Sequence, residues 1–195
     1  MSARRQPVVV LDACVLYPAA QRDLFMWLAA TGAIRAHWSD DIHEEWMRKV
    51  AQDFGIARAV LERVRSLMDE ATDDALIRGY RRHEQLFPLT QANDRHVAAA
   101  AFPARQRSAV DHVAILTWNI KDFDATELSA AGLSVVTPDD FLADLIRESP
   151  EAVRAAFDRM RENLRKPKKT FAECVDALAA QGLKRFSEAL RTLVT

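Results

Sequence analysis

Acidic and amide side chains stand where the chain is predicted to end a strand or begin a helix. Asp12 directly follows the apolar run VVVL, and Asn119 and Asp122 follow a second apolar run in the stretch ILTWNIKDF. Asp94 stands at the start of a helix that leads toward the second run, and Glu45 lies in an earlier helix. A carboxylate among apolar residues is costly to bury without a partner, so Asp12 needs a physical explanation.

The explanation proposed for Asp12 is metal coordination. In an open parallel sheet, ligands bind beyond the carboxyl ends of the strands, so we expect three carboxylates and an amide to converge on one cleft, with Glu45 as a fourth carboxylate. Clustered carboxylates raise one another's pKa, and a divalent cation relieves that repulsion. Because Mg²⁺ and Mn²⁺ prefer carboxylate, amide and water oxygens, the sequence predicts such an ion at the edge of a sheet.

The elements that must position these residues alternate between strands and helices. Buried strands are predicted in PVVVLDA, AIRAHWS, Val113–Thr117 and Leu133–Val136. Amphipathic helices are predicted over residues 22–34, 39–50, 55–71, 73–87, 93–102 and 138–149, with caps at Ser39 or Asp40 and at Asn93 or Asp94. The alternation predicts an α/β fold with a parallel sheet covered on both faces. No strand is expected between Ser39 and Asp94.

The pattern changes after about Ser149. Three helices are predicted over residues 150–164, 169–181 and 183–194, with the basic run RKPKK between the first two and no strand. So small a unit buries little surface alone, and we expect it to pack on the main domain or on a partner. The predicted organisation is a domain over residues 7–147 and an all-helical C-terminal extension over residues 150–195.

Composition restricts the class of protein. The 195 residues carry a formal net charge of −1, so no global basic field indicates nucleic-acid binding, and any such binding needs a local basic patch. Two distant cysteines without metal-type spacing, and no signal peptide, favour reduced thiols in a cytoplasmic protein. The run VVVLDACVLY is too short to span a membrane, so no membrane association is expected.

Four stretches in order, VVVLDACVLYP, SDDIHEEW, NDRHVAAAA and ILTWNIKDF, resemble the PIN-domain nucleases. The resemblance covers about residues 7–147, and TWNIKDF is similar to the branch of VapC-type toxins that carries an asparagine where many members have an aspartate. It implies a three-layer α/β/α sandwich with a central parallel sheet of four to five strands. The C-terminal helices lie outside the minimal PIN domain and resemble an extension.

The resemblance also implies an activity, a Mg²⁺- or Mn²⁺-dependent endoribonuclease that acts as the toxin of a bacterial toxin–antitoxin pair. Expected partners are an RNA substrate and a small antitoxin protein that inserts an arginine into the acidic cleft, and a homodimer is possible. Glu45 rather than Glu44 is preferred because the family acid directly precedes an apolar residue, here Trp46. By motif position, the implied site residues are Asp12, Glu45, Asp94, Asn119 and Asp122, of which Asp12, Asp94 and Asp122 would be metal ligands.

Each residue also has a simpler interpretation. Asp94 is expected to cap a helix as well as bind metal, and Trp118 is expected either to stack on a base or to pack. Because the amide of Asn119 cannot neutralise a cation, a metal-impaired PIN-fold module that binds RNA or protein without catalysis is the alternative function. A different metal-dependent phosphoesterase is a third candidate function.

The basic residues assigned to RNA are Arg95 and Lys121 beside the ligands, Arg35 near a strand start, and Arg165, Lys166, Lys168 and Lys169 in the basic run.

Overall fold

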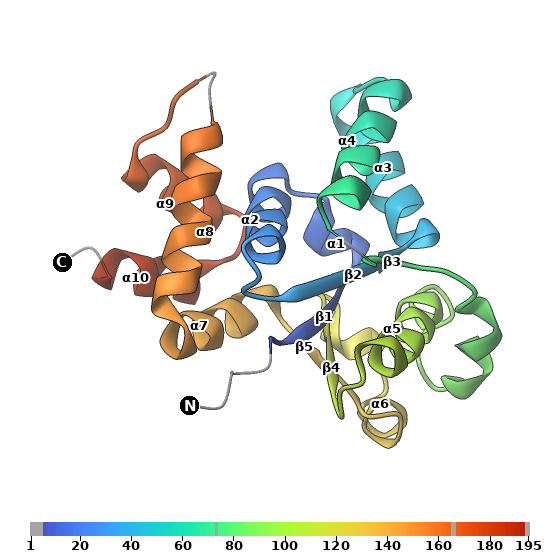
Figure 1. Cartoon of the computed structure of the whole chain (residues 1–195). Helices are drawn as coiled ribbons and strands as arrows, with labels where there is room; N and C mark the ends of the chain where they lie inside the picture. The colour runs from blue at the N-terminus through green and yellow to red at the C-terminus, as the bar shows by residue number, and fades with distance from the viewer. Residues whose placement is uncertain (1–5, 73, 165–166, 194–195) are drawn as a thin grey trace.

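A parallel β-sheet lies at the centre of the protein (Figure 1). The computed structural model describes residues 6–72, 74–164 and 167–193. Within these residues the sheet has five strands in the order β3-β2-β1-β4-β5, and every neighbouring pair is parallel. The α/β fold with four to five parallel strands is therefore confirmed. The strands are β1 (Val8–Leu11), β2 (Arg35–Ser39), β3 (Leu76–Ile77), β4 (Val113–Leu116) and β5 (Leu133–Val136).

The strand order reverses between β1 and β4. From β1 the chain adds β2 and β3 on one side, and then returns through α5 (Arg95–Ser108) to add β4 and β5 on the other. Helix α5 packs against β1, β2, β3 and β4, whereas α2 (Ala19–Ala30) packs against β2, and Figure 1 shows these helices on opposite sides of the sheet. Leu11 and Leu116 are register partners, so the residues that follow β1 and β4 emerge side by side. Ligands bind at such a switch point in doubly wound sheets.

Local signals set both ends of the helix that carries Glu45. Helix α3 (Asp40–Phe54) begins after Ser39, whose Oγ accepts a hydrogen bond from the backbone N–H of Ile42 at 3.3 Å, and Ser39 is therefore the cap. The helix ends at Gly55, which adopts a left-handed φ of 64°. The other helices of this part of the chain are α1 (Ala13–Leu16), α4 (Arg58–Ala71) and α6 (Ala125–Ala130).

The prediction of a helix over residues 73–87 is wrong. Two residues of this stretch form β3, where Leu76 pairs with Trp38 and Ile77 pairs with Ser39. A 3-10 helix, η1 (Arg81–Leu86), follows. Gly79 lies between them at a φ of 67°, a conformation that an α-helix does not contain. A strand of two residues carries no periodicity, so the statement that no strand lies between Ser39 and Asp94 is also wrong.

The C-terminal helices share one core with the sheet domain. The elements are α7 (Pro138–Glu148), α8 (Pro150–Asn163), α9 (Phe171–Ala180) and α10 (Lys184–Thr192). Helix α8 packs against α2 and α7, and α10 packs against α7 and α9, as the red and orange ribbons of Figure 1 show. Phe157 and Phe186 are fully buried. The extension therefore packs on the main domain.

None of the helices in the described part of the chain is both long and apolar enough to cross a bilayer.

Candidate active site

Asp12 is buried at the carboxyl end of β1, where three donors hold it. Asp12 is only 4% exposed, although it is also the N-cap residue of α1. Oδ1 accepts a hydrogen bond from the backbone N–H of Ala13 at 2.6 Å. Oδ2 accepts hydrogen bonds from Thr117 Oγ1 at 2.6 Å and from Cys14 Sγ at 3.1 Å. These donors partly replace the water that a buried carboxylate loses, so the orientation of Asp12 is fixed.

The loop after β4 is held by the same Thr117 hydroxyl that donates to Asp12. Thr117 is fully buried, and its Oγ1 accepts the backbone N–H of Asn119 at 3.0 Å while it donates to Asp12. The chain then turns through η2 (Ile120–Asp122), in which the N–H of Asp122 donates to the carbonyl oxygen of Asn119 at 3.0 Å. Gln91 fixes the end of the turn, because its Nε2 donates to Asp122 Oδ1 at 2.7 Å. Thr117 thus links the acid of β1 to the loop that carries Asn119 and Asp122.

Asp94 lies at the start of α5, and the charges of the other acids affect its pKa. Its carboxylate makes no capping hydrogen bond and has no ion-pair partner among the described residues. Burial raises the pKa of Asp94 to about 6, and the negative charges of Asp12, Asp122 and Glu45 contribute to the rise, against the opposing effect of His96. The register of β1 with β4 and the bond from Thr117 place Asp12 beside the loop that carries Asp122, and the charges of Asp12, Asp122 and Glu45 all act on Asp94.

Glu45 contacts this region through His96. Nε2 of His96 lies 2.9 Å from Glu45 Oε1. Burial lowers the pKa of His96, but the adjacent carboxylate of Glu45 outweighs burial, and the pKa is raised. Glu44 instead faces Arg58, whose guanidinium donates to both of its oxygens at 2.8 and 2.6 Å. The geometry therefore favours Glu45 over Glu44 as the site residue.

The donor set suits a hard divalent cation, but the side chains do not meet at one point. Within the described ranges, no group of three His, Cys, Asp or Glu residues is arranged closely enough to hold a metal ion. The chemistry still fits, since Asp12, Asp94 and Asp122 offer carboxylate oxygens and Asp94 forms no ion pair within the described residues. Coordination by all three would require their side chains to come closer together, and a cation on Asp122 would compete with the hydrogen bond from Gln91.

Cys14, His43 and His112 each contact a different partner. Burial, with a contribution from Asp12, raises the pKa of Cys14 to about 12, so the thiol is protonated at neutral pH and acts as a donor to Asp12. His43 contacts Asp69 at 3.1 Å, and Ser134 Oγ lies 2.9 Å from Nε2 of His112. These contacts place His43, His96 and His112 with different partners and give no zinc site in the part of the chain that the structure describes.

The residues predicted to contact RNA occupy different environments. Lys121 is exposed in η2. Arg95 donates from Nε to the carbonyl oxygen of Thr90 at 2.9 Å and from Nη2 to that of Pro88 at 2.7 Å, so its guanidinium supports the preceding loop. Trp118 is half-buried and packs against the hydrophobic core. Of these three residues, Lys121 is the most accessible to a phosphate.

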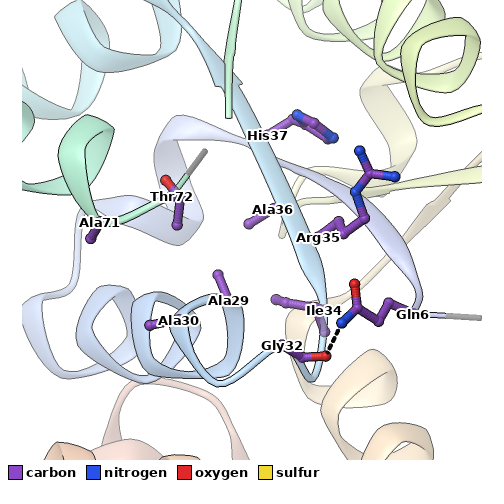
Figure 2. Close-up of a pocket in the computed structure, with 10 residues that line it drawn as sticks. All are labelled: Gln6, Ala29, Ala30, Gly32, Ile34, Arg35, Ala36, His37, Ala71 and Thr72. Carbon is purple, nitrogen blue, oxygen red and sulfur yellow. Dashed lines mark hydrogen bonds between the residues drawn. The ribbon is translucent and has the colours of Figure 1, made fainter. Parts of the chain in front are cut away.

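The remaining basic candidates lie elsewhere. Figure 2 shows Arg35 at the start of β2, beside a cavity of about 240 Å³ that Gln6 and His37 also line. Arg35 pairs in register with Val8, at the opposite end of β1 from Asp12, so this cavity does not belong to the carboxylate region. Lys168 and Lys169 are exposed, whereas Arg165 and Lys166 lie outside the described residues. A separate cavity of about 340 Å³ is lined by Glu45 and His96, with Glu44, Arg48 and Arg81 among its other residues, but not by Asp12, Asp94 or Asp122.

Comparison with known proteins bears on the C-terminal part of the chain. Residues 138–192 match the family model described as the VapC50 C-terminal domain. The matched region spans α7 to α10 and begins before the predicted domain boundary at residues 147–150, which stays a prediction. No curated protein and no solved structure matches the chain. The match supports a relationship to VapC-like toxins of the PIN type, and it does not include the four acids.

Proposed function

We propose that the protein is a Mg²⁺- or Mn²⁺-dependent endoribonuclease that acts as the toxin of a toxin–antitoxin pair. One observation carries the proposal: Thr117 links Asp12 to the loop of Asp122 at the sheet switch point, and burial together with the charges of Asp12, Asp122 and Glu45 raises the pKa of Asp94 to about 6. The similarity of residues 138–192 to the VapC50 C-terminal domain adds support from an independent part of the chain. The branch with asparagine in TWNIKDF, and an antitoxin partner, are part of this proposal.

In this mechanism Asp12, Asp94 and Asp122 would hold the cation. When bound, Mg²⁺ or Mn²⁺ would neutralise charge on the scissile phosphate and lower the pKa of a water molecule. Ala13 and Thr117 keep both oxygens of Asp12 oriented. Glu45 would accept a proton from the attacking water, and cleavage would leave a 5′-phosphate on the product.

His96 would assist Glu45 by holding its carboxylate in place. It is 9% exposed, and its contact with Glu45 Oε1 fixes one oxygen of that carboxylate while the other is left for water. Asn119 would orient the loop through its N–H bond to Thr117 and contribute a neutral oxygen near the acids. Lys121 would contact a phosphate of single-stranded RNA, which exposes its bases and backbone for such recognition.

A binding module without catalysis is the second candidate function. It is favoured by the absence of a three-residue metal group in the described part of the chain, and by the neutral amide at Asn119. Such a module would hold RNA or a protein at the same edge of the sheet. It would bind Mn²⁺ weakly and leave RNA intact.

The test compares wild type with Asp12→Asn, Asp94→Asn and the control Asp144→Asn, which alters an exposed acid paired with Arg147. A mixed single-stranded RNA pool is incubated with Mg²⁺, Mn²⁺ or a chelator. We expect metal-dependent cleavage by wild type and by the control, and a loss of at least about 100-fold in the two site variants. Titration calorimetry with Mn²⁺ should lose its heat in the same variants. Intact RNA together with no Mn²⁺ uptake by wild type would reject the nuclease and leave the binding module.

A further inference from the structure

The turn between α9 and α10 rests directly on Trp118. Gly182 in this turn adopts a φ of +99°, and a Cβ added there would lie 3.0 Å from Cη2 and 3.2 Å from Cζ2 of the indole. Real Cβ atoms essentially never come closer, so no side chain larger than hydrogen fits between the turn and the ring without movement. The glycine is required here both by backbone conformation and by close approach to Trp118.

The turn has its own anchors on the main domain. Oε1 of Gln181 accepts a hydrogen bond from the backbone N–H of Gln21, near the start of α2, at 3.0 Å. The start of α10 is tied to α7, because the N–H groups of Phe186 and Arg185 donate to the two carboxylate oxygens of Asp139 at 2.9 and 3.0 Å. Leu183 beside the turn is fully buried. Two separate elements therefore fix the surface on which Trp118 rests.

Trp118 is also connected to the acidic site through its backbone. Its N–H donates to Sγ of Cys14 at 3.3 Å, and Cys14 in turn donates to Asp12. The preceding residue is Thr117, whose hydroxyl binds both Asp12 and the N–H of Asn119. A shift of the indole would therefore move the hydroxyl that orients Asp12 and the start of the loop that carries Asp122.

We propose that the C-terminal extension positions part of the active site. Gly182 of the extension, packed against Trp118, fixes the position of the Thr117–Asp122 loop, so both act as positioning residues. The inference rests on the proposed nuclease function and adds a role for α9 and α10 within it. Trp118 then serves the site by packing, and RNA bases do not stack on it. The extension sets the position of the loop relative to Asp12, while its own residues remain outside the acidic cluster.

The experiment changes the contact from both sides. Gly182→Ala introduces the Cβ that meets the indole, and Gly55→Ala is the control, because Gly55 also has a positive φ of 64° but nothing within 4 Å of an added Cβ. Trp118→Phe removes the part of the ring that approaches the turn, so the double variant Gly182→Ala with Trp118→Phe has room for the methyl group. Steady-state cleavage of single-stranded RNA is measured together with hydrogen exchange of residues 117–122.

We expect Gly182→Ala to lower kcat by roughly 10- to 100-fold with little change in KM, since small misplacements of catalytic groups cost about this much. Exchange protection over residues 117–122 should fall in Gly182→Ala and not in Gly55→Ala. The double variant should recover most of the lost kcat, which a general loss of stability would not allow. Equal effects of Gly182→Ala and Gly55→Ala on kcat, or no recovery in the double variant, would overturn the inference.

Two outcomes are kept separate by the choice of measurements. If Gly182→Ala does not fold, Trp118→Phe alone is compared with wild type, and an unchanged kcat with unchanged exchange over residues 117–122 would overturn the inference. If wild type cleaves no RNA, the proposed function fails, but hydrogen exchange still decides whether the extension holds the loop. Loss of protection without any nuclease activity would support the positioning role and reject the enzyme.

Discussion

Thr117→Val tests whether one buried hydroxyl holds the site together. Valine has nearly the same shape as threonine, so the change removes hydrogen bonds and leaves the packing of this fully buried residue intact. Oδ2 of Asp12 loses its 2.6 Å donor, and the N–H of Asn119 loses its acceptor at 3.0 Å. The substitution therefore separates the hydroxyl's contribution from that of side-chain volume.

The expected loss of unfolding free energy follows from these two bonds, because the third contact of the hydroxyl, with Cys14 Sγ at 3.4 Å, is long and weak. A hydrogen bond to a charged group contributes about 1.5–3 kcal/mol, and this one is short and buried. The N–H of Asn119 adds little, because Asn119 is exposed and water can replace the acceptor. Asp12 retains its bond from Ala13. We expect a total of about 2–3 kcal/mol, which a domain of ordinary stability, about 5–15 kcal/mol, can lose without unfolding.

The matched control is Thr90→Val. Thr90 is 1% exposed, and its Oγ1 also donates to a carboxylate and accepts a backbone N–H, from Asp124, but at longer distances of 3.2 and 3.3 Å. Guanidinium unfolding should show a smaller loss for this control, about 1 kcal/mol. Mn²⁺ calorimetry and RNA cleavage should be impaired in Thr117→Val alone. Equal destabilisation by both variants, with Mn²⁺ binding unchanged in Thr117→Val, would refute the role given to Thr117.

Three further predictions address catalysis, pH and packing. Glu45→Gln should lower RNA cleavage by about 10²- to 10⁴-fold while Mn²⁺ binding persists, and a smaller effect would remove Glu45 as the base. Burial lowers the pKa of His37 to about 4 from 6.5, so its contribution to stability is present above pH 6.5 and is lost as pH falls toward 4. His37→Asn should therefore flatten the acid limb of a stability–pH curve by about 3 kcal/mol at most. Phe186→Ala, at a fully buried position, should cost about 3–5 kcal/mol in denaturant unfolding.

The central strands could be predicted because they are buried on both faces. Val8–Leu11 is almost wholly inaccessible at the centre of the sheet, and its sequence is correspondingly a continuous apolar run. β3 could not be found in the same way, since it lies at the edge and contributes only Leu76 and Ile77. Its place in the sheet depends on pairing with β2, which is a contact between distant segments that local patterning does not contain.

The sequence assigns acids to a site from motif order and from their places at strand ends and in helices, which stays a prediction, but it does not reveal the contacts that support them. Gln91 is an exposed polar residue in a loop, and nothing in its neighbourhood indicates that its amide reaches Asp122. The approach of Gly182 to Trp118 joins residues far apart in sequence, and the glycine alone predicts only a turn. Periodicity and motif order locate acids along the chain, whereas the contacts that orient them arise when separate elements pack.

The charge of the acidic region bears on the order of binding in the proposed reaction. The negative charges of Asp12, Asp94, Asp122 and Glu45 are opposed by His96, Lys121 and Arg48, while the guanidinium groups of Arg95 and Arg58 are directed to loop carbonyls and to Glu44. RNA phosphates would therefore meet a negative surface at this edge of the sheet, and their approach is unfavourable until positive charge is supplied. A divalent cation would supply it for a substrate, and an arginine of an antitoxin would supply it for an inhibitor. Since both would neutralise the same carboxylates, we expect metal and antitoxin to compete for this region, and RNA to bind tightly only after the metal.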